Sequence, residues 1–333
     1  MKQRPILAVV AAVILAAGTS APAFAADPDN VNLITGPFGT GSYVLGNALE
    51  QISKETSSTV RVNSTETPGL VFNAKKLDTD PALKKNTIMA FTTGIDYLAV
   101  NGIKPFTKKY PGAQLIANYN LGSVWLATFD PKIKSGQDLV GKKIALGRAP
   151  QILWTIEPDF IIRYGWGLQD KINIERLGTK EAAQALLDGN VDAAIVGGYV
   201  DPISGTFAPS PQTVTLLGSG KRLYYIPWGQ EAVAKTIAKG VAIKPLTLPA
   251  GALAGMDAPL PTFVDAIAWV AYPELDQNIA YEVTKMIISN VTKFRDYHAL
   301  GKLMNAKSIL YGWDPKDIAP GALKAYREAG LIK

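Results

Sequence analysis

The sequence contains no cysteine and only one histidine, His298. Without cysteine the chain forms no disulfide, so burial of apolar side chains must stabilise it, and a chain of about 300 residues is long enough for that. The same shortage excludes zinc sites built from histidine and cysteine, and it excludes a catalytic cysteine–histidine pair. We therefore expect no metal and no cofactor, and no lipid attached to a cysteine at a mature N-terminus.

Clusters of one charge are also missing. The chain has 34 Lys and Arg against 28 Asp and Glu, a net charge of +6, and the basic residues are scattered. Nucleic-acid-binding proteins carry a stripe of Lys and Arg, so we expect no nucleic-acid partner. A small positive excess suits the capture of an anionic solute. Beyond the N-terminal segment, no apolar run reaches the ~20 uninterrupted residues of a membrane-spanning helix.

The N-terminal segment has the pattern of a secretory signal peptide. Lys2 and Arg4 precede an apolar run over residues 6–17, and residues 18–25 end on Ala23-Phe24-Ala25. A basic start, a short apolar stretch and an A-x-A end are what signal peptidase recognises. We predict that residues 1–25 are a signal peptide cleaved after Ala25 and that the mature protein is periplasmic. Without Lys2 and Arg4, 32 basic residues face 28 acidic ones, a net charge of +4.

The mature chain alternates short apolar runs with amphipathic stretches, which predicts an α/β fold. The first set of expected strands and helices is 31–35, 59–63, 88–91, 113–119 and 123–129 (strands) with 42–54 and 95–100 (helices). The second set is 143–146, 172–177, 191–196 and 213–217 (strands) with 155–164, 180–188 and 230–238 (helices). An extended linker at 258–261, a long strand at 263–272 and two helices at 275–294 and 315–329 complete the chain.

Two α/β sets joined by extended segments predict two domains with a ligand cleft between them. We expect domain I to comprise residues 26–127 plus 263–333 and domain II residues 128–262. Segments near 118–129 and 259–272 would then form the hinge, and the protein would close on its ligand by bending there.

Three strand-to-helix junctions carry candidate ligand-binding residues. The first is the glycine-rich stretch 36–42, where the N–H groups of a helix start attract an anionic or polar group; we expect Ser42 to be the N-cap. This stretch fits neither nucleotide-binding glycine motif. The second junction carries Thr92 and Thr93, and the carboxyl edge of an open parallel sheet is where ligands bind. At both junctions the alternative is an ordinary capped helix.

The third junction carries Arg148 and Gln151, with Trp154 just beyond them. Arg148 would face the cleft and clamp a carboxylate with two parallel hydrogen bonds, unless it is an ordinary surface arginine. Trp154 would form an apolar wall. The expected ligand-binding set is Thr40, Gly41, Ser42, Tyr43, Thr92, Thr93, Arg148, Gln151, Trp154 and Tyr199.

The sequence offers few candidate catalytic residues. His298 lies in a late amphipathic segment, where a lone histidine is typically a surface or packing residue. Asp188 and Asp192 flank Gly189-Asn190, which is typical of a helix exit and a turn into a strand. No nucleophile and base are visible as a pair, so we expect a binder rather than an enzyme.

Four motifs in order resemble the TAXI solute-binding proteins of TRAP (tripartite ATP-independent periplasmic) transporters, along nearly the whole mature length. They are Gly39-Thr-Gly-Ser-Tyr-Val-Leu-Gly-Asn-Ala-Leu49, Asp138-Leu-Val-Gly-Lys-Lys-Ile-Ala-Leu-Gly147, Leu187-Asp-Gly-Asn-Val-Asp-Ala-Ala-Ile195 and Pro320-Gly-Ala-Leu-Lys-Ala-Tyr-Arg-Glu-Ala-Gly-Leu331. The resemblance implies a two-domain, type II periplasmic-binding-protein fold. It also implies a monomer that captures a small organic anion, such as glutamate or 2-oxoglutarate, and delivers it to TRAP membrane permease subunits.

The sequence departs from this family where the ligand would bind. Thr92, Thr93 and Gly94 stand where the family usually has Gln-Ser-Asp. Residues 150–153, Pro-Gln-Ile-Leu, replace its usual Gly-Ser-Gly-Thr loop, and proline offers no N–H group to a carboxylate. We therefore expect an anionic ligand with more apolar or aromatic character, held by Arg148 and packed against Trp154, Tyr43 and Tyr199.

Other functions share parts of this pattern. The binding protein of an ATP-driven importer, of the taurine- or thiamine-precursor type, has the same fold. A sensory protein that presents its ligand to a membrane kinase would have the same fold and site. A secreted hydrolase or isomerase would need an acid–base or nucleophile pair in the cleft.

Overall fold

The structure is a computed structural model that describes residues 27–148 and 151–333, so the predicted signal peptide and Pro150 lie outside the described residues. The strands are β1 (Asp29–Ile34), β2 (Val60–Thr65), β3 (Thr87–Thr92), β4 (Gln114–Thr128), β5 (Lys143–Leu146), β6 (Asn173–Arg176), β7 (Ala193–Val200), β8 (Phe207–Pro209), β9 (Tyr224–Ile226), β10 (Lys244–Leu248) and β11 (Leu260–Ala271). The α-helices are α1 (Gly41–Thr56), α2 (Leu70–Thr79), α3 (Thr93–Asn101), α4 (Glu157–Phe160), α5 (Thr179–Leu187), α6 (Pro211–Leu217), α7 (Gln230–Ile237), α8 (Gln277–Asn290), α9 (Phe294–Tyr297) and α10 (Pro320–Glu328). Two π-helical turns, η3 (Ile152–Ile156) and η4 (Ile161–Trp166), flank α4.

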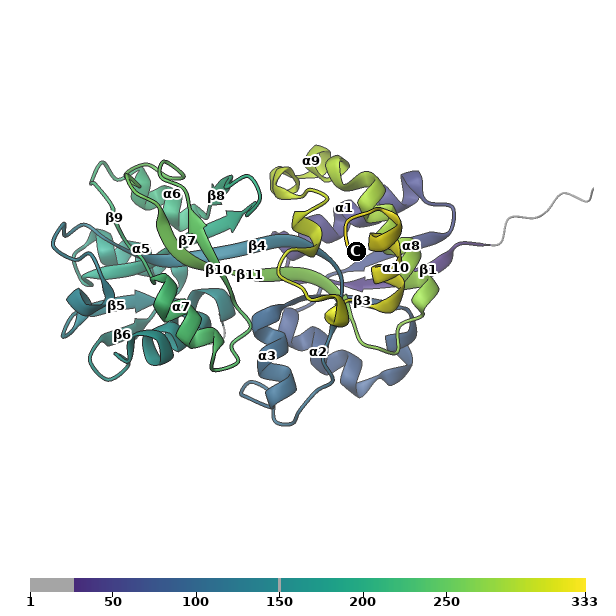
Figure 1. Ribbon diagram of the computed structural model, residues 1–333, viewed down its shortest axis with the longest axis horizontal. Helices are drawn as coiled ribbons and strands as arrows, with labels where there is room; N and C mark the ends of the chain where they lie inside the picture. The colour runs from purple at the N-terminus through teal and green to yellow at the C-terminus, as the bar shows by residue number, and fades with distance from the viewer. Residues whose placement is uncertain (1–26, 149–150) are drawn as a thin grey trace, which may run out of the picture.

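The strands form one mixed sheet in the order β2-β1-β3-β11-β4-β7-β5-β6. At one end β1 pairs parallel with β2 and β3, and at the other end β5 pairs parallel with β6 and β7. The long strands β4 and β11 pair antiparallel in the middle and run between the two halves of the molecule (Figure 1). The sheet is therefore two parallel sets joined by a central antiparallel pair.

Both parallel sets direct their carboxyl ends toward the middle of this central pair. Thr92, at the end of β3, pairs with Ile267 of β11, and Tyr199, near the end of β7, pairs with Gly122 of β4. Ligands of open α/β sheets bind at such carboxyl edges. The topology thus brings two edges of this kind to one place.

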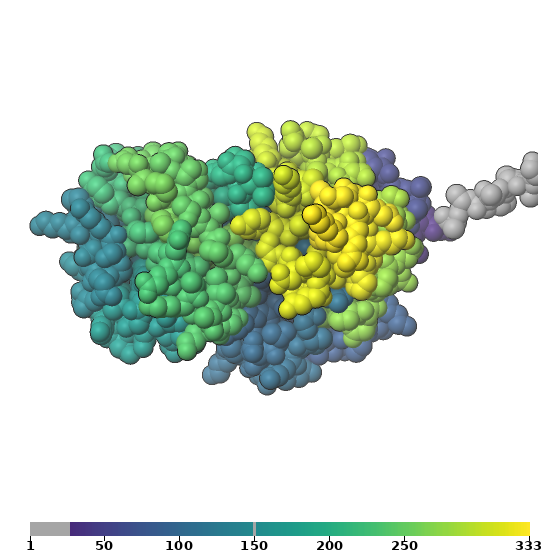
Figure 2. Space-filling view, in the orientation of Figure 1, coloured from purple at the N-terminus to yellow at the C-terminus, as the bar shows by residue number. Residues whose placement is uncertain are grey.

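Two hydrophobic clusters form the core. The first draws on residues 31–119 and 268–326, together with Ile152, and the second on residues 121–266. We call the elements packed on them the first lobe and the second lobe. The C-terminal segment (yellow) covers the first lobe, beside the N-terminal elements (Figure 2). The boundaries predicted for the two domains stay a prediction.

Helix α1 shows how the sequence specifies the first lobe. Leu45, Leu49 and Ile52 recur at helical spacing, and all three are fully buried on one face. The predicted cap is wrong by two residues. Thr40, not Ser42, is the N-cap, because its side chain accepts a hydrogen bond from the Tyr43 N–H, whereas the Ser42 hydroxyl lies 2.6 Å from the Tyr119 hydroxyl.

The strand pair predicted at 113–119 and 123–129 is one strand, β4. Asn and Gly at positions 118–122 are typical of a turn, but Asn118 and Gly122 have structural roles within the strand. The Asn118 amide donates to the carbonyl oxygens of Ser308 and Tyr311. Gly122 makes room for Leu153, since a Cβ there would lie 2.5 Å from its side chain.

Residues 213–217 were expected as a strand and form part of helix α6. Pro211 occupies the first turn, where its fixed φ angle and missing N–H favour a helix start over the β-branched residues that follow. Helix α2 and the short strands β8, β9 and β10 were not predicted. For α2 the reason is that it follows Gly69, which has φ 143°, and that no side chain caps its start. The helix predicted at 155–164 is α4 with parts of the two π-helical turns, and the one predicted at 315–329 is α10 preceded by a separate 3-10 turn. The other predicted strands and helices are present, with ends shifted by a few residues.

Candidate functional site

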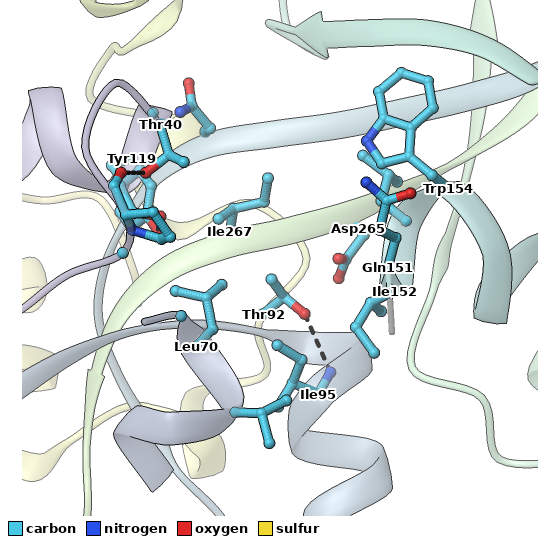
Figure 3. A pocket seen from close by; sticks show the side chains of 18 of the residues that line it. Thr40, Leu70, Thr92, Ile95, Tyr119, Gln151, Ile152, Trp154, Asp265 and Ile267 are labelled. Carbon is cyan, nitrogen blue, oxygen red and sulfur yellow. Dashed lines mark hydrogen bonds between the residues drawn. The ribbon is translucent and has the colours of Figure 1, made fainter. Parts of the chain in front are cut away.

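A cavity of about 460 Å³ lies where the carboxyl ends of the two parallel sets meet. We call it the central cavity, and Figure 3 shows it from close by. Its lining comes from both lobes, as expected for a cleft between them. The described residues that line it are Gly36, Pro37, Thr40, Gly41, Ser42, Pro68, Gly69, Leu70, Val71, Phe72, Thr92, Ile95, Tyr119, Asn120, Gln151, Ile152, Leu153, Trp154, Tyr199, Asp265 and Ile267.

The floor of the cavity is the central strand pair. Asn120 of β4 lies opposite Ile267 of β11, and two residues further along Gly122 lies opposite Asp265. Side chains two residues apart on a strand share a face, and Asn120, Ile267 and Asp265 all line the cavity. The register shifts just beyond Ile267, so Tyr119 is bulged toward the same cavity.

One wall is the start of helix α1. The Thr40 side chain caps the helix, and the first N–H groups of a helix have no intrahelical acceptor. Gly41 lets this end approach the floor closely, because a Cβ there would lie 2.7 Å from Asn120 Nδ2. The wall therefore presents N–H groups and the positive end of a helix dipole beside an amide side chain.

A second wall is the start of helix α3. The Thr92 hydroxyl caps this helix by accepting from the Ile95 N–H at 3.1 Å. The Thr93 hydroxyl donates to Asp265 Oδ1 at 2.5 Å, and the Gly94 N–H donates to the same oxygen at 3.2 Å. These contacts fix one carboxylate oxygen of Asp265 against the helix start.

Asp265 lies near a second buried carboxyl group, that of Glu157 in α4. Neither side chain is more than 1 % exposed, and within residues 27–148 and 151–333 neither Asp265 Oδ2 nor the two Glu157 oxygens have a hydrogen-bond partner. Burial raises the pKa of Asp265 to about 6, although the bonds from Thr93 and Gly94 lower it. Burial, and then repulsion from Asp265, raises the pKa of Glu157 well above its ordinary value.

Asn120 is a third buried polar group without partners. Its side chain is 4 % exposed, and neither its Nδ2 nor its Oδ1 atom has a hydrogen-bond partner among the described residues. An unsatisfied buried amide costs about 1–3 kcal/mol. Since Asn120 lines the cavity, it is placed to bind a ligand there.

The second lobe supplies the remaining wall, from η3 and from β7. Ile152 and Leu153 are buried, while Trp154 and Tyr199 are partly exposed. Gln151 Oε1 accepts a hydrogen bond from the Arg148 N–H at 2.8 Å. Burial raises the pKa of Tyr199, so its phenol stays a neutral hydrogen-bonding group.

Seven of the ten predicted site residues line the central cavity. They are Thr40, Gly41, Ser42, Thr92, Gln151, Trp154 and Tyr199. Tyr43 instead packs on Phe38, with ring centroids 5.1 Å apart, and Thr93 contacts Asp265 from outside the lining. That any of these residues binds a ligand stays a prediction.

Arg148 does not reach the cavity. Its side chain is 67 % exposed and lies 3.7 Å from Glu181, and it is not among the described lining residues. The Arg148 N–H and C=O are bonded to Gln151 and Thr155, and this turn directs the side chain outward. The expectation that Arg148 faces the cleft is therefore wrong.

Asp265, Asn120 and the start of α2 line the cavity but were not predicted as site residues. A signal for Asp265 was present, because it is the one charged residue within the apolar run 263–272. Lys, Glu, Arg and Asp are almost never fully buried unless paired. Within the described lining Asp265 is the only formally charged side chain, so the cavity is acidic at one end and otherwise neutral.

The described residues hold no cluster of three or more His, Asp or Glu able to bind a metal ion. His298 does not line the cavity; its Nδ1 accepts from the Leu300 N–H at 3.1 Å. No helix in the described part of the chain is both long and apolar enough to cross a membrane.

The chain is similar to known proteins in sequence family and in fold. A family model described as the NMT1-like family matches residues 33–330. No curated protein sequence matches the chain. The fold is similar to that of a TctC solute binding protein from Polaromonas, with a TM-score of 0.55 and 13 % identity over 85 % of this chain and 90 % of that one.

It is also similar to XAC2383 from Xanthomonas citri, solved bound to ATP. That TM-score is 0.50, with 10 % identity over 92 % of this chain and all of the other (100 %). At such identities the likeness concerns the fold alone. The predicted fold class, two α/β domains of the periplasmic-binding-protein type around a cleft, is confirmed.

Proposed function

The chain belongs to the NMT1-like family, and on that premise we propose that it is the periplasmic solute-binding protein of an uptake system. The observation that carries the proposal is the central cavity, which is lined from both lobes at the carboxyl ends of both parallel strand sets. Two lobes that share a cavity can enclose a small molecule by bending at the strands that join them. The solved TctC solute binding protein has a similar fold.

The size and lining of the cavity suit a small organic solute. A volume of about 460 Å³ lies within the range of small-molecule sites, which are mostly apolar with a few placed polar groups. Ile95, Ile152 and Ile267 supply apolar surface, and Asn120 and Ser42 supply polar groups. We propose that the solute carries a carboxylate.

The start of α1, rather than Arg148, is the proposed anchor for this carboxylate. The N–H groups of the first helical turn and the helix dipole favour an anion there. Asn120 Nδ2 lies beside them, since a Cβ on Gly41 would lie 2.7 Å from it, and it donates to no other described residue. No cation is needed for a site of this kind.

We propose further that the uptake system is a TRAP transporter of the TAXI type, whose permease receives the loaded protein. The four motifs of that family, in the same order along the chain, support this. A binding protein of an ATP-driven importer would have the same fold and cavity. A TRAP permease gene fused or adjacent to the gene for this chain would favour the first system, and an adjacent ATPase gene the second.

A thermal-shift screen tests the solute-binding function. The mature protein, freed of ligand by unfolding and refolding, is heated with glutamate, 2-oxoglutarate, four-carbon dicarboxylates, and branched or aromatic acids. A ligand at ~100 times its Kd stabilises the folded state by ~2.7 kcal/mol, which gives a clear rise in Tm. We expect at least one organic acid to produce this rise.

The variant Ile267→Trp is the matched control, because a larger side chain in the middle of the floor fills the cavity while Asn120 and Asp265 themselves are unchanged. Its Tm should not respond to the same acid. A response equal to that of the wild type would place binding elsewhere and contradict the proposal. A wild type that responds to none of the acids would contradict it as well.

A further inference from the structure

Asp265 is a buried carboxylate that lines the cavity, and its second oxygen has no hydrogen-bond partner among the described residues. The side chain is fully buried and lines the cavity, and Thr93 and Gly94 bind only its Oδ1 atom. Asp265 Oδ2 has no donor, and no Lys or Arg forms an ion pair with it among the described residues. A buried charge without a counter-charge is strongly unfavourable.

Glu157 increases the negative character of this end of the cavity. Gly94 brings the two carboxyl groups together, since its N–H donates to Asp265 and a Cβ on it would lie 2.4 Å from Glu157 Oε1. Both Glu157 oxygens are buried and have no partner in the part of the chain that the structure describes. Asn120, which lies further along the same floor, also has no side-chain partner there.

A ligand anion placed beside Asp265 would be repelled, whereas a cation would be attracted. Ammonium groups carry three donors and no acceptor, which suits a carboxylate oxygen that lacks a donor. Charge-assisted hydrogen bonds of this type are about twice as strong as neutral ones. The acidic end of the cavity is therefore complementary to a protonated amine.

We propose that the solute captured in the central cavity is an amino acid in the wide sense, whose protonated amine binds Asp265 while its carboxylate binds at Asn120 and the start of α1. This inference rests on the proposed solute-binding function and names the class of solute. Asp265 is then the binding residue for the amine, Glu157 adds negative charge next to it without lining the cavity, and Asn120 is a binding residue for the acid.

The separation of the two ends indicates the spacing of the two charges. Asn120 and Gly122 are two residues apart on β4, and Gly122 is the partner of Asp265, so the ends lie about 7 Å apart along the floor. Ile267 lies between them, with Asp265 on the side of Gln151 and with Thr40 and Tyr119 on the other side (Figure 3). A solute with a short apolar chain between its amine and its acid matches this order.

Calorimetric titration with three ligands that share a six-carbon chain tests the inference. They are 6-aminohexanoate, hexanoate, which lacks the amine, and adipate, which has a second carboxylate in its place. We expect 6-aminohexanoate to bind the wild-type protein at least about tenfold more tightly than either acid, because only it offers a charge-assisted hydrogen bond to Asp265.

The variant Asp265→Asn should remove this preference. It is an isosteric change that keeps an acceptor for Thr93 and Gly94 and removes a buried charge, so the fold should persist, as circular dichroism can verify. We expect it to weaken 6-aminohexanoate binding about tenfold and to leave hexanoate binding unchanged or tighter. Arg148→Ala, an exposed charge change nearby, should leave all three affinities within about twofold.

The outcomes test the amine inference separately from the proposed solute-binding function. If hexanoate or adipate binds the wild type as tightly as 6-aminohexanoate, or if Asp265→Asn leaves the order unchanged, the amine inference is wrong while solute binding stands. If none of the three binds, the inference is also wrong, and the wider screen of acids with Ile267→Trp decides the proposed function separately.

Discussion

Asp265 and Asn120 are buried polar side chains with atoms that no described protein group satisfies. Groups of this kind cost stability, and native proteins retain few of them. Both lie on the floor of one cavity, where a ligand can supply the missing partners. The proposed solute would offset this cost, because it would supply partners to both side chains.

Asp96 makes stability depend on pH in a way that a single substitution can test. It accepts a hydrogen bond from the Ala113 N–H at 3.0 Å, and burial raises its pKa to about 6, to which Asp317 adds by repulsion. A carboxyl group whose pKa is raised in the folded state favours the fold when protonated. Its contribution is fully present below pH ~4 and is lost as the pH rises through ~6.

We expect Asp96→Asn to raise the free energy of unfolding at pH 7.5 by about 2 kcal/mol, because the amide keeps an acceptor for Ala113 and cannot ionise. At pH 4 the variant and the wild type should differ little. Urea unfolding at both pH values measures the two differences. An equal difference at pH 4 and pH 7.5 would show that ionisation of Asp96 has no part in it.

Cavity-lining residues could be predicted from the sequence where backbone geometry determines their position, and could not where the direction of the side chain determines it. Thr40, Gly41, Ser42 and Thr92 lie at strand-to-helix junctions, and junctions can be read from glycine and hydroxyl patterns. The direction of Arg148 depends on a local turn that the sequence does not specify. The burial of Asn120 depends on packing against residues far along the chain.

At the scale of elements, the start of α1 is the segment on which the proposed site depends most. Thr40 Oγ1 accepts from the Tyr43 N–H at 3.3 Å and donates to the Pro37 carbonyl at 2.7 Å. Both bonds hold the glycine-rich loop against the helix. Loss of an N-cap side chain costs about 1 kcal/mol.

We expect Thr40→Ala to lower the free energy of unfolding by about 1 kcal/mol and to weaken ligand binding, because the loop that carries the first N–H groups loses its anchor. Thr40→Ser, which keeps the hydroxyl, is the control and should retain most of both. Urea unfolding and the thermal-shift assay measure the two effects. If Thr40→Ala were as stable as the wild type, the Thr40 side chain would not be the cap that holds this loop.

Most elements could be predicted because apolar periodicity fixes them, as in α1 and α5. The failures have two physical causes. Turn-forming residues in β4 are satisfied by contacts from distant segments, such as Asn118 with Ser308, so the strand continues through them. In α6 a helix-start proline outweighs the β-branched residues that follow it. One sequence does not reveal contacts between distant segments. It also does not show which of two competing structural preferences prevails.

At the scale of the whole molecule, the described chain crosses between the lobes on two strands only, β4 and β11. The border between the two hydrophobic clusters falls beside Tyr119 on β4 and beside Ile267 on β11, where the pairing register shifts. Bulges of this kind bend a strand locally. The predicted hinge segments, 118–129 and 259–272, contain both places, which supports closure of the lobes as the mechanism of capture.

The measurement that tests the central claim most directly is a crystal structure of the protein with the tightest ligand from the thermal-shift screen. We predict that the ligand lies on the floor formed by Asn120, Ile267 and Asp265, enclosed by the starts of α1 and α3 and by Trp154 of the second lobe. A ligand found outside the central cavity, or held by one lobe alone, would contradict the account.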